Sequence, residues 1–148
     1  MAQIQIIVGS VMGTALEVAE AVAATLEGCG HHPHVNSEFQ AGQLSEDADE
    51  VLLICTSNTG MGDLPANIQP FYVHLLNDLP PIAGRRYGLI TLGDSSYPDF
   101  AQAGTTLDEA LADLGANRLG EPLVLDAIMT TDPAEDACDW AMQWESHL

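Results

Sequence analysis

A glycine-punctuated loop directly after the first predicted strand carries residue types that bind anions. The loop, residues 10–15 (SVMGTA), follows the apolar run 4–8 and precedes apolar residues at helical spacing over 16–26. A strand that turns sharply into a helix leaves unpaired backbone N–H groups at the helix N-terminus, where the helix dipole favours negative charge. The pattern predicts a phosphate site, although a plain strand–helix turn has the same pattern.

Two other predicted strands end in turns of related composition. Residues 56–65 (TSNTGMGDLP) follow the apolar run 51–55, and residues 92–100 (LGDSSYPDF) end the next strand. Glycine permits positive φ and lets the backbone approach a flat ring closely, and Tyr97 offers a planar side chain for stacking. Asp63 is predicted to cap the helix that follows it.

The elements that would position these turns alternate between strands and helices. Asp132 and Pro133 are predicted as the N-cap and first residue of the last helix, and Pro70 either begins the regular part of the second helix or kinks it. This alternation predicts a doubly wound parallel α/β sheet with helices on both faces, and ligands bind such sheets beyond the carboxyl ends of the strands. Strands are predicted at 3–9, 33–37, 51–55, 87–92 and 119–125, and helices at 13–28, 66–77, 103–115 and 133–147.

The charge balance is strongly acidic. The 148 residues include 22 acidic side chains, three arginines and no lysine, which gives a formal net charge of −19. Such a surface repels nucleic acid and anionic membranes and favours basic protein partners, while solubility and adaptation to salt remain alternative reasons for the charge. No apolar run approaches the roughly 18 residues of a membrane span and no signal peptide opens the sequence, so a cytoplasmic protein is expected.

Cysteine and histidine show no catalytic or metal-binding pattern. Cys29, Cys55 and Cys138 are far apart and are expected to be free thiols, with Cys55 buried by packing. The histidine-rich run 31–34 is predicted to be a solvated turn that leads into a strand. With no nucleophile–base pair and no metal-ligand spacing, the sequence predicts no catalytic residue and no metal site, and any chemistry would be a cofactor's.

The three turns together resemble the flavodoxin family, especially the short flavodoxins of the MioC type and the FMN domains of diflavin reductases such as sulfite reductase. Residues 56–65 are similar to the family's T-x-G-x-G-D-x-P turn, and residues 92–100 to the reductase pattern L-G-D-S-S-Y-x-x-F. The resemblance covers essentially the whole chain. It implies one FMN-binding domain over residues 1–148, with strand order 2-1-3-4-5 and FMN at the switch point, an arrangement of which flavodoxin is itself a standard example.

The resemblance also implies which residues contact a non-covalently bound FMN. Met12 and Ala15 depart from the family, which has hydroxyl residues at these positions, and Thr59 stands where an aromatic residue is common. Tyr97 is expected to stack on the ring, and Phe100 to pack beneath its loop. The implied contacts are Ser10, Val11, Met12, Gly13, Thr14 and Ala15 for the phosphate, and Ser57, Asn58, Thr59, Gly60, Leu92, Gly93, Asp94, Tyr97, Phe100 and Asp126 near the ring.

By resemblance the protein is a low-potential one-electron carrier, expected to be monomeric, between a flavin reductase and acceptor redox enzymes, both of them basic partners. Two alternatives stay open at this point. One is an FMN-dependent oxidoreductase that acts on quinone-like small acceptors. The other is a non-redox acidic regulatory module, which the altered phosphate loop and Thr59 keep possible.

Overall fold

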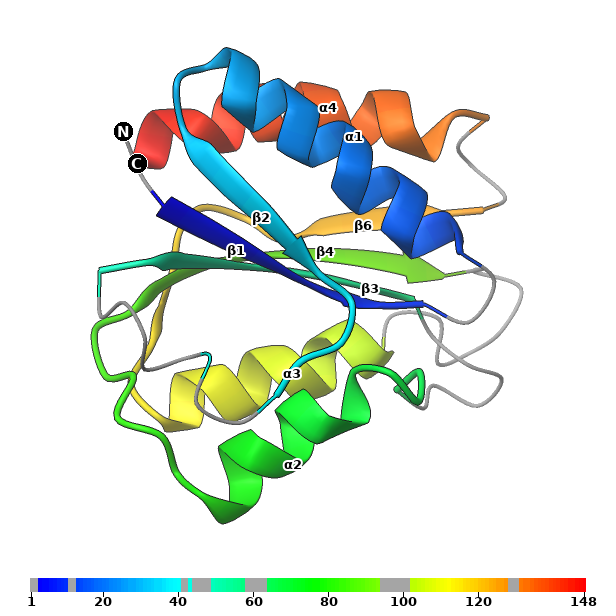
Figure 1. Cartoon of the computed structure of the whole chain (residues 1–148). Coiled ribbons are helices and arrows are strands. Elements are labelled where there is room, and N and C mark those ends of the chain that lie inside the picture. The colour runs from blue at the N-terminus through cyan, green and yellow to red at the C-terminus, as the bar shows by residue number, and fades with distance from the viewer. Residues whose placement is uncertain are drawn as a thin grey trace.

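Helices cover both faces of a central sheet in the computed structural model (Figure 1). The structure describes residues 3–10, 13–40, 43, 49–57, 64–93, 102–127 and 131–148. The elements are β1 (Gln3–Gly9), α1 (Thr14–Gly28), β2 (His32–Asn36), β3 (Val51–Ser57), α2 (Gln69–Asn77), β4 (Arg86–Gly93), α3 (Gln102–Asp113), β5 (Asn117–Arg118), β6 (Leu123–Asp126) and α4 (Pro133–Trp144), followed by a 3₁₀ turn at Glu145–His147.

The sheet is parallel and follows the predicted order, with one difference at its edge. Its strands lie in the order β2-β1-β3-β4, and β5 and β6 both pair with β4. The single strand expected at 119–125 is therefore split in two. Gly120 has φ +71° between the two pieces, and Pro122 has no backbone N–H to donate to a ladder, so pairing is interrupted there.

Successive side chains along each strand point to opposite faces of the sheet, so the core consists of two apolar layers. Ile4, Ile6 and Val8 of β1 pack with Val18 and Val22 of α1 and with α4 on one face. On the other face, Ile54 of β3 packs against α2 and α3. This period of two is the one expected for strands buried on both faces. The packing on the first face holds α1 in a fixed position relative to the ends of the strands.

A buried polar side chain lies on the α2 side of β1. Gln5 is buried, and its amide donates to Glu50 Oε1 at 2.7 Å and accepts from Asn36 Nδ2 at 2.8 Å. Asn36 Nδ2 also donates to Gln43 Oε1 at 2.8 Å. These bonds tie the segment after β2 to the sheet and satisfy groups that would otherwise be costly to bury.

The predicted helix ends are partly confirmed. Asp132 Oδ1 accepts from the Glu135 N–H at 3.1 Å, so Asp132 is the N-cap of α4, and Pro133 begins the helix. Pro70 stands at the start of α2 and does not kink it. Asp63, the residue predicted to cap this helix, lies outside the described residues, and the structure has Ile68 at the N-cap of α2.

The histidine-rich run is more ordered than a solvated turn. β2 begins at His32, and His31 is buried with its Nε2 3.1 Å from Glu145 Oε1. The apolar pattern did not reveal this because the partner, Glu145, lies at the far end of the chain.

Leu79 holds strain that glycine would relieve. It follows α2 with φ +45° and a 66 % exposed side chain, a conformation that costs an L-residue about 1–2 kcal/mol. Part of the stability gained by removing this strain is offset, because the conformational entropy that glycine loses on folding costs about 0.5–1 kcal/mol more. We expect Leu79→Gly to raise the free energy of unfolding in urea by about 0.5–1 kcal/mol. The matched control, Leu76→Gly within α2, should lower it by about 1 kcal/mol. If both substitutions lowered the free energy of unfolding, the inference that Leu79 is strained would be contradicted.

Candidate functional site

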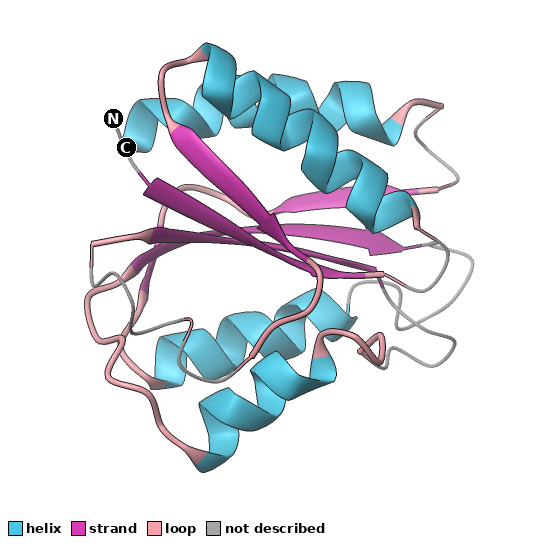
Figure 2. Ribbon diagram, in the orientation of Figure 1, coloured by secondary structure: helices cyan, strands magenta, loops and turns pink. Residues whose placement is uncertain are grey.

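Four strands bring their carboxyl ends to one edge of the sheet, at the right in Figures 1 and 2. The register pairs Gly9 of β1 with Thr56 of β3, and Ser57 of β3 with Leu92 of β4. It also pairs Gly93 with Asp126 of β6. The segments singled out after the first, third, fourth and last strands therefore start side by side, as the switch-point rule for such sheets requires.

Ser10 and Gly13 build the described part of the turn between β1 and α1. The Ser10 hydroxyl accepts the Gly13 N–H at 2.9 Å, and Gly13 has φ +89°, a left-handed conformation that favours glycine. Gly9 is tightly enclosed, since a Cβ there would lie 2.5 Å from Thr56 Oγ1 and 2.7 Å from Ile68 Cγ2. A side chain at this position would therefore clash with β3 and with the residue that precedes α2.

The first turn of α1 offers hydrogen-bond donors for which the described residues provide no acceptor. In the part of the chain that the structure describes, the backbone N–H groups of Thr14, Ala15 and Leu16 have no acceptor, and the exposed Thr14 hydroxyl has no partner. A Cβ placed on Gly13 would meet nothing within 4 Å, so the space beside the turn is open. These donors at a helix N-terminus fit a phosphate group.

Two of the implied site residues can contribute only their backbone. The side chain of Ala15 is fully buried and that of Leu92 nearly so, both in the α1 layer of the core. Cys55 beside them is buried as predicted, and its thiol donates to the Ala15 carbonyl at 3.4 Å. Burial raises the pKa of Cys55 to about 12, so the thiol stays protonated and is no redox nucleophile.

On the side where a ring would lie, the structure describes the strand ends and not the turns. Ser57 Oγ donates to the Gly9 carbonyl at 3.4 Å, and the Ala127 N–H donates to the Gly93 carbonyl at 2.8 Å, which fixes the end of β6 against β4. The other implied site residues lie outside the described residues: Val11, Met12, Asn58, Thr59, Gly60, Asp94, Tyr97 and Phe100.

All three arginines lie at the opposite end of the sheet, where the strands begin. Arg86 begins β4 and Arg118 ends β5, which pairs with the first residues of β4. The seven residue steps from Arg86 to Gly93 span roughly 23 Å at about 3.3 Å each. Arg118 is bound to Asp108 at 2.7 Å, and the buried Arg85 donates to the Glu50 carbonyl at 3.3 Å. No arginine or lysine is therefore near the edge where the strands end.

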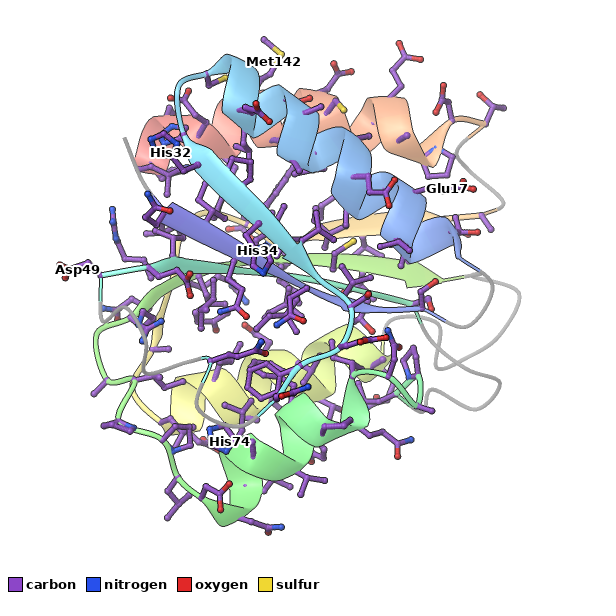
Figure 3. The ribbon with its side chains drawn as sticks, in the orientation of Figure 1. Glu17, His32, His34, Asp49, His74 and Met142 are labelled. Atoms are coloured by element: carbon purple, nitrogen blue, oxygen red, sulfur yellow. The ribbon has the colours of Figure 1, made fainter. Side chains whose placement is uncertain are left out.

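Acidic side chains lie at both ends of the strands in Figure 3. Asp49 lies at the left, toward the end of the sheet where the strands begin. Glu17, in the first turn of α1, lies at the right, where the strands end. An anion bound at this edge would be held by neutral donors and the helix dipole.

Sequence reasoning missed Asn67, whose side chain accepts the Ser10 N–H at 2.9 Å. The available signal was weak: an amide two residues after Pro65, just past the end of the second motif.

A doubly wound parallel sheet with a helix N-terminus at its switch point is an architecture in which α/β proteins bind nucleotides. The family model described as Flavodoxin matches residues 6–140. The chain belongs to the flavodoxin family, and the resemblance drawn from its three turns is confirmed.

Similar proteins span nearly the full length of the chain. Flavodoxin YqcA of Pectobacterium carotovorum is 40% identical over 97% of this chain and 95% of its own length. Protein MioC of Escherichia coli K12 is 37% identical over 100% of this chain and 99% of its own. The solved structure of a cysteine-to-serine mutant of flavodoxin from Pseudomonas aeruginosa has a TM-score of 0.93 at 37% identity, covering 99% of this chain and 98% of that one.

Family membership establishes the cofactor and the general role. Flavodoxins bind FMN and act as electron-transfer flavoproteins, not as enzymes in the strict sense, and an electron carrier implies redox partners. Among the residues that the structure describes, no helix is long and apolar enough to cross a membrane.

Proposed function

We propose that residues 1–148 work as one FMN-binding domain that carries single electrons at low potential from a flavin reductase to an acceptor redox enzyme. The observation that supports this most directly is the set of N–H donors at the start of α1 that no described residue accepts, beside the aligned ends of β1, β3, β4 and β6. When bound, FMN supplies the chemistry, because its ring accepts and releases electrons one at a time.

In this proposal the protein holds FMN without a cation. The N–H groups of Thr14, Ala15 and Leu16 and the Thr14 hydroxyl would bind the phosphate, and the Ser10 hydroxyl would hold Gly13 in place. The ring would lie beside the ends of β3 and β4. Its proposed contacts are Ser57, Asn58, Thr59, Gly60, Leu92, Gly93, Asp94, Tyr97, Phe100 and Asp126.

A comparison of FMN with riboflavin tests the proposed site. The two ligands share the ring and differ in the phosphate, so only a working phosphate loop separates them. With several new hydrogen bonds to a charged group, we expect apoprotein to bind FMN at least about tenfold more tightly than riboflavin in calorimetric titration. Equal affinities for the two ligands would show that the loop does not bind the phosphate.

The partners are proposed to be basic proteins that dock on the acidic surface. With a net charge of −19, long-range attraction should raise the rate of encounter with a basic reductase. The screening length falls from about 10 Å at 0.1 M salt to about 3 Å at 1 M. Stopped-flow reduction by such a reductase should therefore slow markedly over this range, and a flat profile would argue against charge steering.

A further inference from the structure

The side chain of Asn67 joins three segments that are distant in the sequence. Its Oδ1 accepts the backbone N–H of Ser10 at 2.9 Å. Its Nδ2 donates to the carbonyl of Val8 at 3.0 Å and to the carbonyl of Ser37 at 3.1 Å. One residue, placed between β3 and α2, thus binds the end of β1, the first residue of the phosphate loop and the residue after β2.

These contacts use both donors of the amide and one acceptor, so no other side chain of similar size replaces them. An aspartate would place a carboxylate oxygen against two carbonyl oxygens, and an apolar residue would leave the Ser10 N–H without this acceptor. The pattern requires an asparagine side chain in this orientation, and the three bonded partners fix that orientation.

Asn67 and the Ser10 hydroxyl hold the two described ends of the turn between β1 and α1. Asn67 holds the backbone of Ser10, and the Ser10 hydroxyl in turn accepts the Gly13 N–H at 2.9 Å. Gly13 directly precedes Thr14, the first of the α1 residues whose N–H groups have no acceptor among the described residues. We propose that Asn67 is a positioning residue for the phosphate loop and sets the preference of this site for a phosphorylated over an unphosphorylated flavin.

The alignment of the hydrogen-bond donors matters more in this site than in a phosphate site that contains a lysine or an arginine. A lysine or arginine attracts phosphate from a distance and over many directions, but neutral N–H donors act only when they are aligned. All three arginines of this chain lie at the opposite edge of the sheet, so misalignment of the loop cannot be compensated by charge. This inference rests on the proposed phosphate site, and its test separates the two.

The test compares FMN and riboflavin binding to wild-type apoprotein, Asn67→Ala and the control Gln69→Ala. Gln69 is an amide of the same connection, and it donates to the Leu64 carbonyl at 3.2 Å. We expect Asn67→Ala to weaken FMN binding about tenfold and riboflavin binding by less than about twofold, since loss of aligned donors affects only the phosphate. Gln69→Ala should leave the ratio of the two affinities unchanged.

Each other outcome overturns a specific statement. If Asn67→Ala weakens both ligands equally, or neither, Asn67 does not act on the phosphate and the inference is wrong, while the proposed site stands. If the wild type itself binds both ligands equally, the phosphate site fails and the inference fails with it. Urea denaturation of each apoprotein reports whether it folds. If Asn67→Ala does not fold, Asn67→Ser, which keeps a short polar side chain that cannot reach all three partners, takes its place with the same expectations.

Discussion

Replacing Gly104 by alanine should lower the free energy of unfolding by about 3 kcal/mol, at the upper end of what overpacking costs. Gly104 is buried in the first turns of α3, where the helix meets β4. A Cβ there would lie 1.8 Å from Thr91 Oγ1, 2.9 Å from Thr91 Cβ and 3.0 Å from Thr91 Cγ2. A rotation of the Thr91 hydroxyl cannot relieve contacts with its Cβ, so α3 must move away from the sheet. Urea or thermal unfolding of the apoprotein measures the loss.

Two further variants show whether this contact is the cause. Gly28→Ala, at the end of α1 where a Cβ would meet nothing within 4 Å, should be neutral or slightly stabilising. Thr91→Ala removes two of the three clashing atoms, so the double variant with Gly104→Ala should recover part of the stability, with a coupling of about 1 kcal/mol or more. Independent effects of the two substitutions would contradict the proposed close packing.

The fold was predictable because its signals are local and repeated. The run 51–55 and the pair Asp132–Pro133 each specify an element by apolar content or capping chemistry, and the structure confirms the strand and the cap. The break between β5 and β6 has local signals too, Gly120 and Pro122, but the apolar residues on either side of them, Leu119 and 123–125, suggested one continuous strand. Apolar periodicity gives the type of an element better than its interruptions.

The site was only partly predictable because its support comes from side chains distant in sequence. The turn at Ser10 and Gly13 could be read from glycine spacing, since the conformation of Gly13 is a local property. The contact between Asn67 and Ser10 joins residues 57 positions apart, and no local pattern encodes it. The location of the three arginines likewise follows from the pairing of β5 with β4, which places Arg118 beside the start of β4.

The location of these arginines predicts a low potential for adding the second electron to bound FMN. Reduction adds negative charge at the edge where the strands end, and the nearest arginine along β4, Arg86, is roughly 23 Å from Gly93. Asp94 directly follows Gly93 in sequence, and Asp126 pairs with Gly93 across the sheet. Because the proposed ring contacts include these two acidic residues and the arginines are far away, we expect electrostatic repulsion to disfavour the reduced flavin.

Neutralising one of these carboxylates should therefore raise the potential of the second one-electron step. A unit charge at about 7 Å contributes roughly 2.4 kcal/mol at an effective dielectric near 20 and about 0.6 kcal/mol in water. Since about 1.4 kcal/mol corresponds to 59 mV for one electron, Asp94→Asn should raise this potential by between about 25 and 100 mV. The matched control is Asp113→Asn, which removes the same charge from the exposed end of α3 at the opposite edge and should shift it far less. Anaerobic redox titration of the three FMN-loaded proteins decides the matter: an equal shift in both variants would reflect net charge alone, and an unchanged or lower potential in Asp94→Asn would refute the electrostatic explanation.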